Sequence, residues 1–232
     1  MVRNLILTGG IRHPFEDSAP ALAGLLEGAG IRSEITQDIE GGLDRLARGG
    51  FDLVTVYALR WRMLSGEKYA PDRPAWEFSL SQDGRRALET HVAGGGGLLG
   101  LHTAVICFDD WPGWRDLLGG AWVWGRSFHP PRGPIAVAPT GAAHPITAGV
   151  SDFRLASDEV FSELDLAGDV TPLLEAEAEG EAKRGTWPVL WARSVGRGRV
   201  VCDTLGHDRA SLEDAAHRRI LVNGALWAAG RL

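Results

Sequence analysis

Cysteine, excess positive charge and long apolar runs are all scarce in this sequence. Its 232 residues include only two cysteines, Cys107 and Cys202, with no CxxC spacing, so we expect two reduced thiols in a cytoplasmic protein. Acidic residues outnumber basic ones, 30 to 24. This balance argues against nucleic-acid or anionic-membrane partners, which require a basic surface. No stretch approaches the roughly 20 apolar residues that span a bilayer, and the apolar start is too short for a signal peptide.

Tryptophan, by contrast, is abundant. The chain has nine tryptophans against two tyrosines, and six of the nine fall between Trp61 and Trp124. Indole rings supply large apolar surfaces for a core, and they also stack on sugar rings. Both uses remain open, and Trp61, Trp124, Phe128 and Trp187 are the aromatic side chains we expect at the mouth of a binding cleft.

Apolar runs alternate with amphipathic stretches through the first half of the chain. Strands are predicted at 4–10, 31–36, 51–59 and 97–101, and helices at 17–30, 39–50 and 79–97. Asp17 or Ser18 is the expected N-cap of the first helix. This alternation predicts a mostly parallel sheet with helices on both faces. The long loop at 60–78 has the length of a binding loop.

The second half has a different pattern. Short strands are predicted at 133–139, 170–178, 187–195 and 198–205, without long helices between them, and a final helix from about Ser211. This pattern indicates an antiparallel extension of the same sheet. No linker or repeat interrupts the chain, so we predict a single domain over residues 1–232.

A histidine stands at the turn that follows the strand at 97–101. The sequence Gly100-Leu101-His102-Thr103-Ala104 has small residues two before and two after His102, as a sharp strand-to-helix elbow requires. A helix beginning there would disfavour imidazolium through its dipole. A neutral imidazole suits a general base or a metal ligand.

Four histidines are expected at strand ends or in adjoining loops that could face one cleft: His13, His102, His129 and His207. Such a group is typical of a catalytic divalent metal site, zinc first, with Glu159 and Asp208 completing or orienting it. Without a metal, His102 and His207 would act as an acid–base pair, with Asp208 or Glu159 fixing a tautomer. His91, His144 and His217 are expected to be structural, with His217 on the surface. Arg126 is a candidate for holding an anionic substrate group.

Four motifs in this order carry a family resemblance: GGGGLLGLHTA from Gly94, RSFHPP from Arg126, HPITAGVSDF with SDE from His144, and GRGRVVCDTLGHD from Gly196. Together they resemble the trehalose-utilisation, or ThuA-like, family over nearly the whole chain. The resemblance implies a flavodoxin-like three-layer sandwich similar to class I glutamine amidotransferases. It also implies that His102 replaces the elbow cysteine of true glutaminases, and that His207 and Asp208 lie near their catalytic histidine.

The resemblance implies a function in sugar metabolism. Thioester-forming glutaminase chemistry is excluded because the elbow has no thiol, and Cys107 is expected on the following helix. We therefore expect an enzyme of the hydrolase, lyase or isomerase type that acts on a sugar or keto-sugar. The alternative is a non-catalytic sugar-binding or regulatory protein that retains an amidotransferase-like pocket. The tryptophan-rich loops are compatible with a homodimer.

Overall fold

Strands and helices alternate through the first half of the protein, as the sequence predicts. The computed structural model describes residues 1–180 and 185–232. Its first half contains β1 Val2–Gly10, α1 Phe15–Glu27, β2 Ile31–Thr36, α2 Ile39–Ala47, β3 Leu53–Leu59, α4 Gln82–Ala93 and β4 Gly97–Leu101. The predicted N-cap of the first helix is wrong. Helix α1 begins at Phe15 after Pro14, and the Ser18 hydroxyl donates back to the Pro14 carbonyl within the helix.

Within the described residues, five parallel strands form one half of a nine-stranded sheet, in the order β2-β1-β3-β4-β11, with β11 spanning Gly198–Asp203. This order is that of the flavodoxin-like doubly wound sheets. Ligands of such sheets bind beyond the carboxyl ends of the parallel strands. A ligand site is therefore expected at the residues that directly follow β1, β4 and β11.

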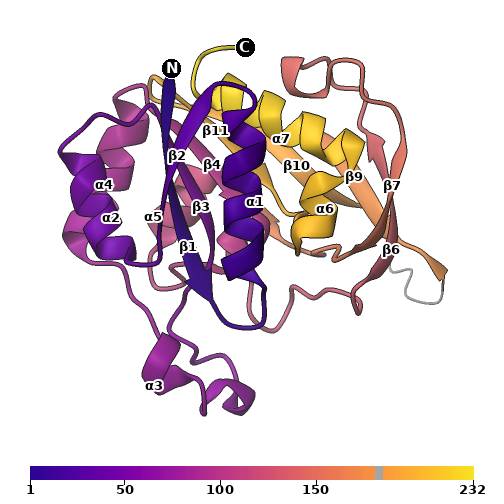
Figure 1. The fold of residues 1–232 in the computed structure, drawn as a ribbon. Helices are drawn as coiled ribbons and strands as arrows, with labels where there is room; N and C mark the ends of the chain where they lie inside the picture. Colours follow the sequence, from indigo (N-terminus) through magenta and orange to yellow (C-terminus); the bar gives the residue numbers. More distant parts are fainter. Residues whose placement is uncertain (181–184) are drawn as a thin grey trace.

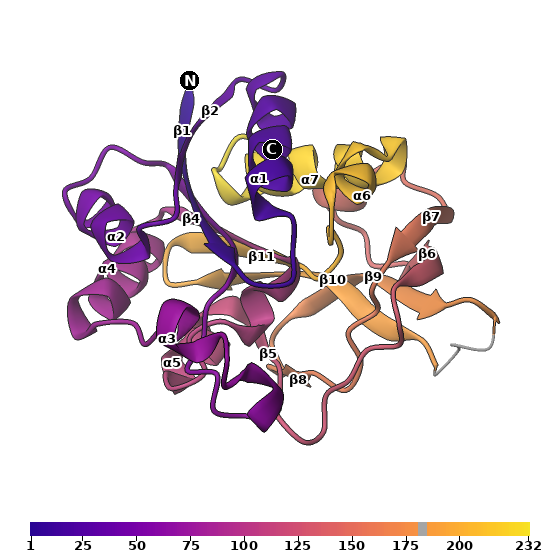
Figure 2. The ribbon, with the colours of Figure 1, turned by 60° about the horizontal axis from the view of Figure 1, so that its bottom comes forward.

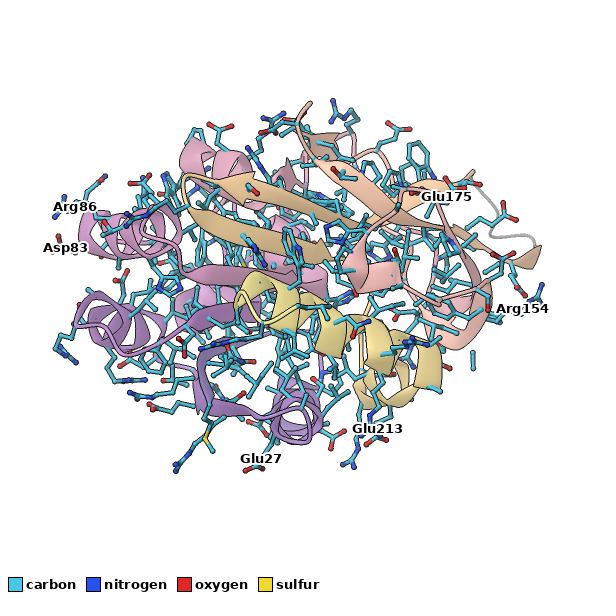
Figure 3. The ribbon with its side chains drawn as sticks, turned by 90° about the horizontal axis from the view of Figure 1, so that it is seen from above. Glu27, Asp83, Arg86, Arg154, Glu175 and Glu213 are labelled. Carbon is cyan, nitrogen blue, oxygen red and sulfur yellow. The ribbon has the colours of Figure 1, made fainter. Side chains whose placement is uncertain are left out.

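The central strands bury side chains on both faces, and successive residues belong to different cores. In β3, Leu53, Tyr57 and Leu59 join one apolar cluster, whereas Val54 and Val56 join the other. Helices α1 and α7 (Ala215–Ala228) cover the first face, and α2, α4 and α5 (Pro112–Leu118) cover the second (Figure 1). The result is the predicted three-layer sandwich. Charged side chains such as those of Glu27, Asp83 and Glu213 project outward at its margins (Figure 3).

The other half of the sheet is antiparallel and continues from β11 as β10 Trp187–Val195, β9 Thr171–Ala178, β6 Gly133–Pro139 and β7 Phe153–Asp158. The sequence predicted this extension but not β7, whose residues FRLASD lack a clear apolar alternation. Short elements were also missed: α5, the 3₁₀ turn η3 Pro145–Thr147, and the small sheet of β5 Gly120–Ala121 with β8 Asp165–Leu166.

The predicted final helix is two helices, α6 Arg209–Glu213 and α7. The break comes at Asp214, whose carboxylate accepts the Ala216 and His217 amides and so caps α7 as a new helix.

The segment at 60–78 lies near the carboxyl ends of the parallel strands and contains two short elements, η1 Glu67–Tyr69 and α3 Arg73–Trp76 (Figure 2). An ion pair joins it to the turn after β1, with Arg12 Nη2 2.8 Å from Asp72 Oδ2. None of the helices in the described residues combines the length and apolarity that membrane crossing requires.

Candidate metal and substrate site

The elbow at His102 is a strained turn, as the small residues around it predict. Strand β4 ends at Leu101, and His102 has φ +52°, in the left-handed region that non-glycine residues rarely adopt. A Cβ on Gly100 would lie 2.5 Å from Leu118 Cδ1, so a larger residue there would require the Leu118 side chain to move. The Thr103 hydroxyl fixes the turn by donating to the Ala58 carbonyl over 2.6 Å.

The element after the elbow differs from the predicted helix. It is η2, a five-residue 3₁₀ turn over His102–Ile106, and not an α-helix. Cys107 accordingly follows this turn and does not lie on a helix. A helix dipole is therefore not the reason for a neutral His102. The side chain is fully buried, and burial lowers its pKa well below the ordinary value, with His13 contributing further.

Four potential ligand atoms gather beyond the ends of four strands. They belong to His13 after β1, His102 after β4, Glu159 after β7 and His207 after β11, and all lie within 4.8 Å of one another. Residues from four distant parts of the sequence thus meet at the edge where doubly wound sheets bind ligands.

The two innermost histidines face each other through their Nε2 atoms, 3.0 Å apart. His13 Nδ1 is 3.1 Å from the Ile11 carbonyl, and His102 Nδ1 is 2.9 Å from the Thr204 carbonyl. A carbonyl can only accept, so both Nδ1 atoms carry protons, and in the neutral rings both Nε2 atoms present lone pairs. Burial lowers the pKa of His13 to about 4, so both rings are neutral near pH 7.

Two facing lone pairs repel unless a cation lies between or beside them. The tautomers are those of metal-ligating histidines, whose other ring nitrogen usually donates to a carbonyl or carboxylate. Two nitrogens bound to one tetrahedral zinc at about 2.0–2.1 Å are about 3.3 Å apart, close to the separation observed here. The donor set therefore fits a divalent metal ion.

Glu159 supplies negative charge beside these imidazoles. Its carboxylate lies 3.6 Å from His102 Nε2 and 3.8 Å from His207 Nε2. Burial raises the pKa of Glu159, and the neighbouring His129 and His207 partly offset that rise. A largely buried carboxylate without a bonded cation is costly, and the Glu159 side chain is only 11% exposed, which is consistent with a metal at this position.

His207 and Asp208 have separate surroundings although they are neighbours in sequence. The Arg132 guanidinium donates to Asp208 over 2.7 Å and also contacts His207 Nδ1 at 3.2 Å. Asp208 caps α6 by accepting the Ser211 amide. It therefore lies outside the group of four potential ligands. Because a guanidinium can only donate, His207 Nδ1 accepts from Arg132, and the proton of a neutral His207 ring is on Nε2.

His129 lies beside the four ligands without joining them. Its Nδ1 is 2.9 Å from the Pro130 carbonyl and 3.6 Å from Glu159. The side chain is 40% exposed and lines a cavity that opens over the site. The structure thus brings His13, His102 and His207 together, and leaves His129 at the cavity wall.

That cavity has a volume of about 320 Å³ and is largely aromatic. Its floor includes His13, Glu159 and His207. Its aromatic walls are Trp61, Tyr69, Trp122, Trp124 and Phe161. Trp61 and Trp124 stack with their ring centroids 6.0 Å apart, and Tyr69 meets Trp61 edge-on.

Three residues predicted to bind substrate lie elsewhere. Phe128 and Trp187 pack against each other, with ring centroids 6.4 Å apart, and neither lines the cavity. Arg126 is exposed and donates to the Glu163 carbonyl. Sequence reasoning missed Tyr69, Trp122 and Phe161. Two of these could have been predicted from the sequence, because Tyr69 belongs to the predicted binding loop and Trp122 to the tryptophan-rich region. For Phe161 the sequence offers only its position two residues after Glu159.

The prediction that His217 lies on the surface is wrong. Its side chain is fully buried, with Nε2 3.2 Å from Asp203 Oδ2 and Nδ1 2.8 Å from the Ser211 carbonyl. Arg218 and Arg219, which follow it in sequence, favour a solvated face, but α7 turns the His217 side chain toward the core. His91 and His144 contact backbone groups, of Gly97 and Ile146 respectively.

Comparison with known proteins agrees with this architecture. The profile of the family described as "ThuA: Trehalose utilisation" matches residues 3–228. No curated protein matches the sequence. Two similar solved structures are described as ThuA-like. One, from Parabacteroides merdae, has a TM-score of 0.77 at 19% identity and covers 98% of this chain and 90% of its own. The other, from Bacteroides uniformis, has a TM-score of 0.72 at 18% identity, covering 98% and 91%.

A third similar structure is a Salmonella typhimurium LT2 protein described as cytoplasmic. It has a TM-score of 0.65 at 14% identity, and the match covers 97% of this chain and 99% of that one. At these identities the solved structures establish the fold, while the profile match establishes the family.

Proposed function

The chain belongs to the ThuA family of trehalose utilisation, and from this premise we propose that it is an enzyme acting on a sugar or keto-sugar with the help of a divalent metal ion. Zinc is the first candidate, because imidazole nitrogens and carboxylate oxygens are usual ligands of catalytic zinc, which can expand from four to five ligands to admit a substrate or a water molecule. His13, His102, His207 and Glu159 would hold the ion. The small-molecule substrate would occupy the aromatic cavity, and we expect the protein to work in the cytoplasm.

One observation carries this proposal: the facing Nε2 atoms of His13 and His102. Each ring already gives its Nδ1 proton to a backbone carbonyl, and burial keeps each ring neutral. A purely structural pair would share a proton between the rings or turn one ring away. A metal ion satisfies both lone pairs at once.

The placement of His102 favours the metal over simple acid–base catalysis. Its side chain is fully buried and does not line the cavity, so it has no direct access to a substrate. His129 lines the cavity and lies outside the ligand group, so it is a group able to exchange protons with a substrate while the ion is bound. When bound, a metal ion would polarise a carbonyl or hydroxyl group, or acidify a water molecule.

The aromatic walls support a carbohydrate as the substrate. Indole and phenol rings stack against the apolar faces of sugar rings, and the partly exposed Trp124 and Tyr69 form an aromatic wall with the buried Trp61 packed against both. Binding of a metal ion through His207 Nε2 would require the ring proton to move to Nδ1 and the Arg132 contact to be released. The cavity volume of about 320 Å³ is at the small end of ligand sites.

Glutaminase chemistry has no support in this geometry. The elbow side chain is an imidazole, and the nearest thiol, Cys107, is buried, with its pKa raised by burial to about 12. Its Sγ contacts the Ala58 carbonyl over 3.2 Å. Such a thiol does not form the thiolate that a thioester mechanism needs.

The alternative, a non-catalytic sugar-binding protein, is favoured by the same aromatic walls, and the two functions predict different results. Elemental analysis of protein purified without chelator or nickel column tests the metal, with His102→Ala as the test variant and His91→Ala as the matched control. We expect near-stoichiometric zinc, manganese or iron in the wild type and in His91→Ala, and its loss in His102→Ala. A wild type that takes up none of these metals would overturn the metal-dependent function. Sugar binding by such a protein, measured by thermal shift, would then establish the alternative.

A further inference from the structure

A buried carboxylate next to the proposed ligands takes no part in binding substrate or metal. Asp158 ends strand β7 and is only 1% exposed. It is absent from the four ligand residues and from the cavity lining. Burial raises its pKa, and the hydrogen bonds it accepts partly offset that rise. A group as costly to bury as this one needs a structural reason.

Four donors from three separate segments surround this carboxylate. Oδ1 accepts the Glu159 amide at 2.8 Å and the His207 amide at 3.3 Å. Oδ2 accepts the Gly206 amide at 2.9 Å and the Ser211 hydroxyl. An ionised carboxylate offers about four lone-pair sites, so its capacity is fully used.

Two of these donors are the backbone amides of proposed metal ligands. Glu159 follows β7, in the antiparallel half of the sheet, whereas His207 follows β11, in the parallel half. The strands β10, β9 and β6 lie between β11 and β7 in the sheet, so their pairing alone does not fix the distance between these two ligands. The Asp158 carboxylate joins the two segments directly.

We propose that Asp158 is a positioning residue that holds Glu159 and His207 in the relative positions needed to bind one metal ion. This inference rests on the proposed metal site. Groups that orient metal ligands typically contribute 10- to 100-fold to metal affinity. Asp158 does so through main-chain amides, not through the ligand side chains themselves.

The network behind Asp158 extends the same support to a third ligand. Ser211 joins Asp158 to His217, and His217 contacts Asp203. Asp203 accepts the Leu205 amide at 3.0 Å and so shapes the turn after β11. That turn presents the Thr204 carbonyl, which fixes the tautomer of His102.

The test compares three variants with the wild type. Asp158→Asn keeps the size of the side chain but turns one acceptor oxygen into a donor that faces an N–H or O–H. Ser211→Ala removes one of the four donors and keeps the carboxylate. Thr55→Val is the matched control, since Thr55 is fully buried and donates to Asn4 Oδ1 away from the site.

The readouts are zinc affinity, by competition with a chromophoric chelator, and the absorption spectrum of bound Co²⁺, which reports coordination geometry. We expect zinc affinity to fall 10- to 100-fold in Asp158→Asn, less in Ser211→Ala, with altered cobalt spectra in both. Thr55→Val should lose thermal stability while keeping the affinity and spectrum of the wild type. If Asp158→Asn fails to fold, Ser211→Ala decides the question by the same two readouts.

The outcomes separate the two proposals. A wild type that binds neither Zn²⁺ nor Co²⁺ overturns the proposed function itself. If the wild type binds both ions and folded Asp158→Asn keeps the same affinity and spectrum, only the role of Asp158 is overturned. If Asp158→Asn does not fold, an unchanged affinity and spectrum in Ser211→Ala overturn that role. An equal loss of affinity in Thr55→Val would show that general destabilisation is the cause, and would also overturn that role.

Discussion

Full burial affects two histidines of this protein in opposite directions. His102 lies among other imidazoles, and although the Glu159 carboxylate is 3.6 Å away, burial dominates and the pKa of His102 falls well below the ordinary value. For His217, burial alone would also lower the pKa, but the carboxylates of Asp203 and Asp158 outweigh it and the pKa rises. The first residue is thus held neutral, as a metal ligand must be, and the second is held charged, as part of a buried ion pair.

The charge on His217 predicts a pH-dependent contribution to stability. Because its folded-state pKa is raised, the contribution is complete below the unfolded pKa of about 6.5 and is lost as the pH rises through the folded value. Removing one partner of a buried ion pair costs about 3–5 kcal/mol. We therefore expect His217→Gln to lower the free energy of unfolding by about that amount at pH 6, and by less at pH 9, as measured by urea denaturation.

The matched control for this prediction is the double variant Asp203→Asn/His217→Gln, which leaves no unpaired charge. At pH 6 it should cost less than the sum of the two single variants, since the single variants each leave one buried charge behind. An equal cost of His217→Gln at pH 6 and pH 9 would contradict a charged His217.

At the scale of the elements, the elbow after β4 stores strain at the proposed site. His102 adopts φ +52°, and left-handed backbone costs an L-residue about 1–2 kcal/mol. Glycine avoids this cost. We expect His102→Gly to be at least as stable as His102→Ala in urea denaturation without metal, although glycine is about 0.5–1 kcal/mol less stable than alanine in ordinary helices and strands.

The same pair of substitutions at His91 is the control. His91 lies within α4, where His91→Ala should be more stable than His91→Gly by about 1 kcal/mol. The same order of stabilities at both positions would show that the elbow is unstrained.

Which elements the sequence predicted depends on how they are stabilised. The parallel strands bury both faces, so continuous apolar runs such as LVTVYAL in β3 predict them directly. Strand β7 lies at the sheet edge and buries few apolar side chains, so its sequence has little periodicity. The N-cap of α1 was missed because the helix begins at Phe15, three to four residues before a helix capped by Asp17 or Ser18 would begin.

The site follows the same logic. His102 and His207 could be predicted because a strand end in a doubly wound sheet is a functional position. The displacement of His129 from the ligands, the burial of His217 and the role of Asp158 depend on contacts between segments far apart in sequence. Asp158 and Ser211, for example, are 53 residues apart, and no local pattern reports that they are in contact.

At the scale of the whole molecule, the proposed metal would join parts of the chain that fold against different neighbours. Its ligands span positions 13 to 207 and come from both the parallel and the antiparallel half of the sheet. A ligand that binds only the folded state stabilises it by RT ln(1 + [L]/Kd). Because no short segment contains the complete donor set, the unfolded chain competes weakly for the ion.

Zinc should therefore raise the melting temperature of the whole protein in a single transition. At a free zinc concentration of 100 times Kd the stabilisation is about 2.7 kcal/mol. For a protein of this size that corresponds to a rise of about 5–10 °C. The measurement is calorimetry of metal-free protein with and without added zinc, in parallel with His102→Ala and His91→Ala. His91→Ala should respond like the wild type and His102→Ala should not, since it loses one of the two facing imidazoles. A rise of the same size in His102→Ala would place the zinc elsewhere on the protein. The absence of a rise in the wild type and in both variants would overturn the proposed metal site at the facing histidines.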